Sequence, residues 1–181
     1  MSNADEFAEF FPMSPVPQEG GYYLETFRSD ITIDFSTAGT PHNGHRSLST
    51  AIYYMLTNDS CSSLHKLTGD EVYHFYAGDP VELLQLFPDG SSATVVLGQD
   101  FKHGMRFQHT VQGGVWQGSK LLARGRCAIL GTTMAPGFDP RDFVKGDPEL
   151  DFSAVADVLD IGHEAGVDHI GLITPKVAAG Q

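Results

Sequence analysis

The sequence is poor in positive charge. Its 181 residues include 11 Lys and Arg against 23 Asp and Glu, so the formal net charge is -12 at pH 7, and the basic residues form no run. A polyanion would be repelled over most of such a surface. The composition therefore argues against nucleic acid as a partner.

Long hydrophobic runs are also missing. No stretch approaches the roughly twenty apolar residues that a membrane-spanning helix needs. The first residues contain neither a basic region nor the apolar core of a signal peptide. We therefore expect no membrane partner and a cytoplasmic location.

Cysteine is scarce, with only Cys61 and Cys127 in the sequence. The two have no metal-ligand spacing and fall in or beside segments that we predict to be strands, so a disulfide framework is not indicated. We expect both to pack as small apolar residues.

Turn-forming residues are abundant and lie between short apolar segments, with 20 Gly and 10 Pro along the chain. Gly78-Asp79-Pro80 and Pro88-Asp89-Gly90 are examples. Their spacing is typical of antiparallel sandwiches and barrels. Alternating or β-rich runs predict strands at 22–27, 31–35, 50–56, 72–76, 81–87, 93–97, 105–111 and 126–134.

The expected organisation is one all-β domain over residues 1–181. Its core covers about 18–143, and an appendage covers about 144–181. In the appendage, apolar residues recur at helical spacing between Asp151 and Ala165, which predicts a short helix outside the sheets. No repeat or linker suggests a second domain.

The stretch 62–79 is the most informative for chemistry. We interpret it as a strand, a tight turn at 68–70 and a second strand, which would place His65 and Glu71 opposite each other in a hairpin, with Tyr73 beside them. An imidazole, a carboxylate and a phenol in an apolar interior are costly to bury, and burial shifts their pKa toward values useful in proton transfer. The alternative is a satisfied core hydrogen bond or an ion pair at the rim.

The same stretch resembles the first cupin motif, in which ligand histidines are followed by a Glu and, after six residues, a Gly; Glu71 and Gly78 fit that interval. The sequence of this stretch is similar to that of a small cupin branch long catalogued as a domain of unknown function (cupin type five). That branch is itself similar to dTDP-sugar epimerases. Further segments of 18–143 share the resemblance: Glu19-Gly20-Gly21-Tyr22, Ser49-Thr50-Ala51-Ile52-Tyr53, Gly113-Gly114-Val115-Trp116-Gln117 and Ala135-Pro136-Gly137-Phe138.

The resemblance implies a jelly-roll barrel (double-stranded β-helix) with an interior pocket for a small organic molecule, and a homodimer. In metal-binding cupins the first motif supplies two His and a Glu, and the second motif another His. Here Ser63 stands where the earlier His would lie, and Gln117 stands near the final His. We therefore expect no tightly bound cofactor, and at most a weak divalent metal held by His65, Glu71 and Gln117.

Other residues are secondary candidates. His74 belongs to the sequence motif that resembles the family. Strict alternation nevertheless turns it to the face opposite Glu71 unless a bulge intervenes. Arg28 could anchor a carboxylate or phosphate, or lie solvated at a strand end. Trp116 could stack on a substrate ring at the pocket mouth, or pack in the core. His42 and His45, in a polar loop, are expected to be solvated.

The function that these features favour is a metal-independent proton-transfer reaction, such as isomerisation, epimerisation, elimination or cyclisation. His65 would be the general base, Glu71 would orient it or hold the substrate, and Tyr73 or Tyr53 would donate a proton to the developing oxyanion. The expected substrate contacts are Arg28, His74, Trp116, Gln117 and Ser63. Two alternatives stay open, a metal-dependent oxygenase or isomerase and a non-catalytic binding or storage barrel.

Overall fold

The computed structural model describes residues 3–17, 19–37, 39–122, 124–146 and 155. Helix α1 (Asn3–Phe10) precedes a series of strands. The strands are β1 (Ser14–Pro15), β2 (Tyr22–Arg28), β3 (Thr32–Asp34), β4 (His45–Ser47), β5 (Thr50–Thr57), β6 (Ser62–Leu67), β7 (Glu71–Gly78), β8 (Val81–Leu86), β9 (Ser92–Leu97), β10 (Gln108–Val111), β11 (Trp116–Leu121), β12 (Cys127–Met134) and β13 (Phe143–Lys145). Short 3-10 helices lie at Phe101–His103 and Pro140–Asp142.

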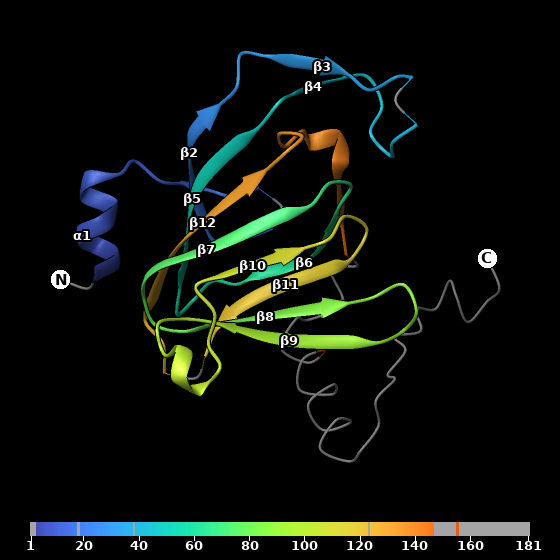
Figure 1. The fold of residues 1–181 in the computed structure, drawn as a ribbon. Helices are drawn as coiled ribbons and strands as arrows, with labels where there is room; N and C mark the ends of the chain where they lie inside the picture. Colours follow the sequence, from blue (N-terminus) through green and yellow to red (C-terminus); the bar gives the residue numbers. More distant parts are fainter. Residues whose placement is uncertain (1–2, 18, 38, 123, 147–154, 156–181) are drawn as a thin grey trace.

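Two antiparallel sheets form two layers (Figure 1). The six-stranded sheet has the order β1-β2-β5-β12-β7-β10, and the five-stranded sheet has the order β13-β6-β11-β8-β9. Strands β3 and β4 pair with each other as a separate ribbon. The predicted all-β jelly roll is confirmed.

The core lies between the inner faces of the two sheets. Two-residue alternation along each strand turns every second side chain inward. Tyr73 and Phe75 of β7 therefore meet Leu83 of β8 and Leu130 of β12 in one buried cluster. The polar sequence of β11, WQGSKL, hid this central strand from the sequence analysis, although Gln117 and its two successors are buried.

The predicted hairpin at 68–70 is wrong. Strands β6 and β7 belong to different sheets, so the turn between them crosses from one layer to the other. The partner strands of β7 are β12 and β10, and the residue opposite His65 on β11 is Gln117. His65 and Glu71 thus reach the same interior from facing sheets.

Helix α1 covers part of the outer face of the six-stranded sheet, at the left of Figure 1. Its Phe7 packs with Met13 against a small cluster that includes Met55 and Cys127. The Phe7 ring also meets the edge of the Tyr53 ring at a centroid distance of 5.6 Å. This contact identifies the Tyr53 side of β5 as the outer face.

The helix predicted between Asp151 and Ala165 lies, apart from Val155, outside the described residues. In the part of the chain that the structure describes, no helix has the length and apolar character needed to cross a membrane.

Candidate functional site

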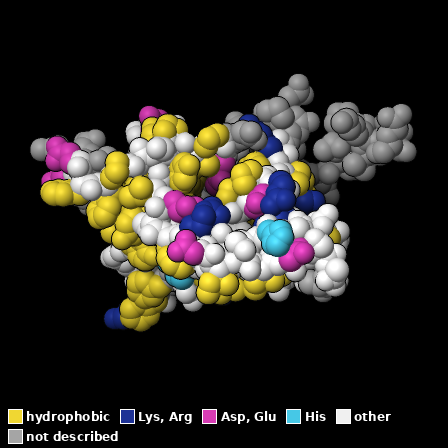
Figure 2. Space-filling view, turned by 90° about the horizontal axis from the view of Figure 1, so that it is seen from above, with side chains coloured by type: hydrophobic (Ala, Val, Ile, Leu, Met, Phe, Trp, Pro, Cys, Tyr) yellow, Lys and Arg dark blue, Asp and Glu magenta, His cyan; other side chains and the backbone are white. Residues whose placement is uncertain are grey.

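A cavity of about 470 Å³ lies against the inner face of the six-stranded sheet, a size typical of ligand pockets, which span roughly 300–1,000 Å³. On the face of the molecule seen in Figure 2, hydrophobic, acidic and basic side chains surround a hollow. Apolar side chains in its wall include Val16, Ile52, Leu67, Met134, Phe138 and Phe143. Polar ones include Glu19, Glu25, Arg28, Tyr54, Glu71 and Tyr73.

Strand alternation explains which side chains reach the cavity. On β7, Glu71 and Tyr73 point inward and line it, and on β5 Ile52 and Tyr54 do the same. The intervening residues, among them Tyr53, point to the outer face. Glu71 and Tyr73 are therefore brought together on one wall, as the sequence predicted.

A β-bulge in β2 adds two charged groups to the cavity wall. Glu25 lies opposite Ile52, and Arg28 lies opposite Thr50, so both face inward although they are three residues apart. The register shift between Glu25 and Phe27 makes this possible, because the bulge absorbs one residue. Without it, alternation would turn Arg28 away from the cavity.

Glu71 is the central polar group of the inner wall. It is 8% exposed, and its Oε2 accepts a hydrogen bond of 2.9 Å from Gln117 Nε2. Burial raises the pKa of the Glu71 carboxyl, and the nearby charge of Glu19 adds to the rise. The positive potential of His65 and hydrogen bonding by Thr132 and Gln117 oppose it. A carboxyl in this environment can take up or release a proton closer to neutrality than an exposed one.

Tyr73 lies beside Glu71 and is 1% exposed. Burial raises the pKa of its phenol well above the usual value, and the charge of Glu71 raises it further. The phenol therefore stays neutral, and hydrogen bonding to Glu71 also favours its protonated form.

The sequence matches the family described as Cupin superfamily (DUF985) over residues 5–145. The chain belongs to the cupin superfamily. It is 32% identical over 143 residues to the uncharacterized protein YML079W of Saccharomyces cerevisiae, covering 74% of this chain and 71% of the yeast protein.

Two solved structures resemble this cupin over nearly its whole length. Protein SO0799 from Shewanella oneidensis has a TM-score of 0.73 and 29% identity, covering 96% of this chain and 100% of that one. A hypothetical protein from Leishmania major has a TM-score of 0.71 and 28% identity, covering 93% and 99% of the two chains.

His65 of this cupin is buried behind the cavity wall rather than in it. Its ring stacks on Phe143, which does line the cavity, at a centroid distance of 5.2 Å. Its Nδ1 lies 2.9 Å from the carbonyl oxygen of Ser63. A carbonyl can only accept, so Nδ1 carries the proton, and in the neutral ring Nε2 is the acceptor. The interaction that links His65 to the cavity is its effect on Glu71, whose pKa it lowers.

The donor set of this cupin does not fit a tightly held metal. One imidazole, one carboxylate and one amide, from His65, Glu71 and Gln117, are the available ligands. Among the described residues no three His, Cys, Asp or Glu side chains are grouped as a metal site would require. A divalent or redox metal would need further strong N or O ligands.

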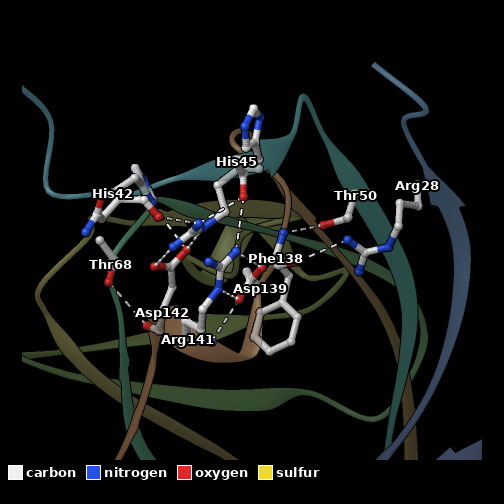
Figure 3. Close-up of polar contacts among 11 residues, drawn as sticks. Arg28, His42, His45, Thr50, Thr68, Phe138, Asp139, Arg141 and Asp142 are labelled. Atoms are coloured by element: carbon white, nitrogen blue, oxygen red, sulfur yellow. Dashed lines mark hydrogen bonds and ion pairs between the residues drawn. The ribbon is translucent and has the colours of Figure 1, made fainter. Parts of the chain in front are cut away.

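Arg28 is engaged within the protein. Its Nε and Nη2 donate to Glu25 Oε1 and Oε2 at 3.0 and 2.7 Å, and its Nη1 donates to the Phe138 carbonyl oxygen at 3.1 Å. In Figure 3 its guanidinium points toward the backbone of Phe138. An anionic ligand would have to displace Glu25 to bind Arg28 in a bidentate manner.

Besides His65, five predicted site residues are absent from the cavity wall; among them, Gln117 is buried beside Glu71 and bonds to it. Tyr53 packs on the outer face against Phe7. His74, also on that face, contacts Thr133 Oγ1 at 3.1 Å. Trp116 faces outward under the ammonium of Lys66, 5.0 Å from its ring centroid. Ser63 contributes its backbone, since its N–H donates to the Glu19 carbonyl oxygen at 2.7 Å.

A buried charged cluster that no sequence pattern indicated lies at one edge of the cavity. We call it the lip cluster, and it consists of His42, Arg46 and Asp142 (Figure 3). Arg46 Nε and Nη2 donate to Asp142 Oδ2 and Oδ1 at 2.7 and 2.9 Å. His42 Nδ1 lies 3.3 Å from Asp142 Oδ2. The expectation that His42 is solvated is wrong, because the side chain is almost fully buried in this network.

The lip cluster holds the 41–46 loop against the turn that leads into β13. Arg46 Nη1 also donates to the carbonyl oxygens of Asn43 and His45, which fastens the loop to itself. Hydrogen bonding by Arg46 is the main cause that lowers the pKa of Asp142. Pro140 and Phe143, on either side of Asp142, line the cavity, so the cluster positions part of its wall.

Proposed function

We propose that this cupin binds a small organic molecule in its cavity and catalyses a proton transfer on it, of the isomerase, epimerase, lyase or cyclase type. The observation that carries the proposal is Glu71, a buried carboxyl with a raised pKa that faces a cavity of about 470 Å³ beside the neutral phenol of Tyr73. Perturbed titratable groups in a pocket are typical of acid–base sites.

The geometry favours Glu71 as the general acid or base. It lines the cavity, whereas His65 lies behind Phe143 and tunes Glu71 as a positioning residue. Tyr73 would donate a hydrogen bond to an oxygen that gains negative charge in the transition state, in exchange for its bond to Glu71. The apolar wall excludes water and strengthens these interactions.

Deuterium incorporation tests the proposal on many candidate substrates at once. The purified protein is incubated in D₂O with a mixture of small carbonyl-containing metabolites, and mass spectrometry finds any compound that gains mass only when the protein is present. We expect Glu71→Gln to abolish the exchange. Tyr53→Phe, which removes a hydroxyl from the outer face, should retain it.

The competing function is a binding or storage barrel without catalysis. It would be supported by compounds that co-purify with the protein, or bind it reversibly, and never exchange protons with solvent. Retention of exchange by Glu71→Gln would overturn the role of Glu71.

We also propose that the chain pairs as a homodimer through the outer face of the six-stranded sheet. Phe27 and Tyr76 are 54% and 49% exposed on that face. Light scattering at micromolar concentration should give twice the chain mass, and Phe27→Lys should lower it. A monomeric mass would contradict the proposal.

A further inference from the structure

The cavity wall carries an excess of negative charge. Glu19, Glu25 and Glu71 line it, and among the described residues Arg28 is the only basic side chain in the wall. Glu25 occupies the Arg28 guanidinium with two hydrogen bonds. Within the described part of the chain, neither Glu19 nor Glu71 has a Lys or Arg partner.

The two remaining carboxylates act on each other. Glu19 accepts a hydrogen bond of 2.8 Å from Ser62 Oγ, which is a neutral partner. Its charge is close enough to Glu71 to hinder ionisation of the second carboxyl. Like charges in a poorly solvated site are stabilised when a cation enters between them.

An unsatisfied acceptor lies next to Glu71, outside the cavity lining. Gln117 is 1% exposed, and its amide reaches Glu71 through Nε2. Its Oε1 has no hydrogen-bond donor among the described residues. Buried carbonyl oxygens are rarely left without a donor. This amide supplies Glu71 with one hydrogen bond and no compensating charge. We call Glu19 and Glu71, which line the cavity, its acidic end.

The rest of the wall suits the body of an organic cation. The rings of Tyr23, Tyr73, Phe138 and Phe143 face the cavity. Aromatic faces attract cations as well as apolar groups. A ligand of mixed character, with one charged end and one apolar end, matches both parts of the wall.

We propose that the ligand of this cavity is an organic ammonium ion, a primary or secondary amine on a small apolar body, whose N–H groups bind at the acidic end. This inference rests on the proposed function only in requiring that the cavity binds a small molecule. It replaces the expectation of an anionic ligand held by Arg28, because Glu25 occupies that guanidinium.

Ligands of similar shape and different charge test whether the cavity prefers a positively charged ligand. Isothermal titration calorimetry at about pH 7.5 compares phenethylamine with 2-phenylethanol and 3-phenylpropanoate, and butylamine with butanol and pentanoate. We expect each amine to bind at least about tenfold more tightly than its alcohol, and each acid to bind more weakly than the alcohol.

Variants that remove one negative charge show which carboxylates cause the preference for amines. Glu19→Gln and Glu71→Gln should each lower amine affinity by about tenfold and lower alcohol affinity much less. Glu82→Gln is the control, because it removes the same charge from a residue that pairs with Lys120 outside the cavity. Glu25→Gln should free Arg28 and raise the affinity for the acids.

The outcomes separate the two proposals. Alcohols or acids that bind as tightly as the amines would overturn the charge inference and leave a ligand-binding cavity. Amine binding that survives in Ile52→Trp, where the new side chain fills the cavity, would place the binding elsewhere and overturn the inference as well. If neither series binds at millimolar concentration while deuterium exchange on another compound is found, the charge inference falls and the proposed function stands. If neither ligand binding nor deuterium exchange is found, both the charge inference and the proposed function fall.

Discussion

The lip cluster and the acidic end of the cavity bury similar groups with opposite results. At the lip, Asp142 is held by both arms of Arg46 and by His42, and its pKa is lowered. At the acidic end, Glu71 has a neutral amide partner and a like-charged neighbour, and its pKa is raised. A buried carboxylate that is fully paired supports the fold, whereas one left without a cation is available to a ligand.

The two clusters also predict opposite responses to pH. A lowered pKa means that Asp142 stabilises the fold above its ordinary pKa of about 3.9 and loses that contribution as the pH falls. A raised pKa means that the neutral form of Glu71 is favoured in the fold. Its contribution is therefore present below an ordinary Glu pKa of about 4.3 and is lost as the pH rises through the folded value.

Breaking the lip pair should give the largest change. Asp142→Asn leaves the Arg46 guanidinium buried without a countercharge, and we expect the free energy of unfolding to fall by about 3–5 kcal/mol. Urea denaturation at neutral pH measures it. Asp139→Asn is the matched control, since the more exposed Asp139–Arg141 pair should contribute no more than about 1 kcal/mol. Equal losses in both variants would contradict the structural role of the lip.

The loss of unfolding free energy at acid pH should depend on the same carboxylate, Asp142. Between about pH 6 and pH 2.5 the gap in unfolding free energy between wild type and Asp142→Asn should narrow by more than about 1 kcal/mol, because protonation of Asp142 weakens the pair in the wild type. Urea titrations at several pH values supply the curve. A gap that stays constant with pH would assign the acid loss to other groups.

At the acidic end, removing the charge should stabilise the fold. Glu71→Gln abolishes an unfavourable buried charge and allows the Gln117 amide to turn its oxygen toward a donor. We expect Tm to rise at about pH 7.5 by roughly 2–4 °C, the change that ~1 kcal/mol gives in a chain of this size. Differential scanning calorimetry at about pH 4 should show a smaller gain. A fall in Tm at neutral pH would mean that the Glu71 carboxylate is structural.

The Arg28–Glu25 pair at the entrance of the cavity should have the smallest effect on stability. Arg28 and Glu25 have side chains 42% and 38% exposed, and pairs of this kind contribute about 0.2–1 kcal/mol. Arg28→Met should therefore lower unfolding free energy by less than about 1 kcal/mol, and the loss should shrink in high salt. A larger loss of unfolding free energy that does not depend on salt would mean that this pair stabilises the fold, as the lip cluster does.

The fold was largely predictable because jelly-roll strands are short, apolar and separated by turn residues. Periodicity identified β5, β7, β8 and β12, whose inward faces are largely apolar. It missed β11, whose buried residues are polar or small, and it could not show that the turn at 68–70 crosses between sheets. Turn chemistry is local, and it does not specify which strands pair.

The site was predictable only where alternation is regular. Glu71 and Tyr73 share a face because they are two residues apart in an unbroken part of β7. His42 and Asp142 gave no signal, because their contact joins residues a hundred positions apart through a loop and a turn. Glu19 and Phe143 reach the cavity from segments with no periodic pattern.

The bulge in β2 makes the entrance of the barrel tolerant of small changes in chain length. Loss of Thr26 would restore regular pairing while Glu25 and Arg28 still faced inward, since two-residue spacing is what alternation requires. Relatives can therefore carry the same entrance charges at either spacing, and a comparison of aligned letters alone would miss the equivalence. A regular strand of the present length would instead turn Phe27 into the opening and Arg28 out of it, exchanging a charged entrance for an aromatic one without any substitution.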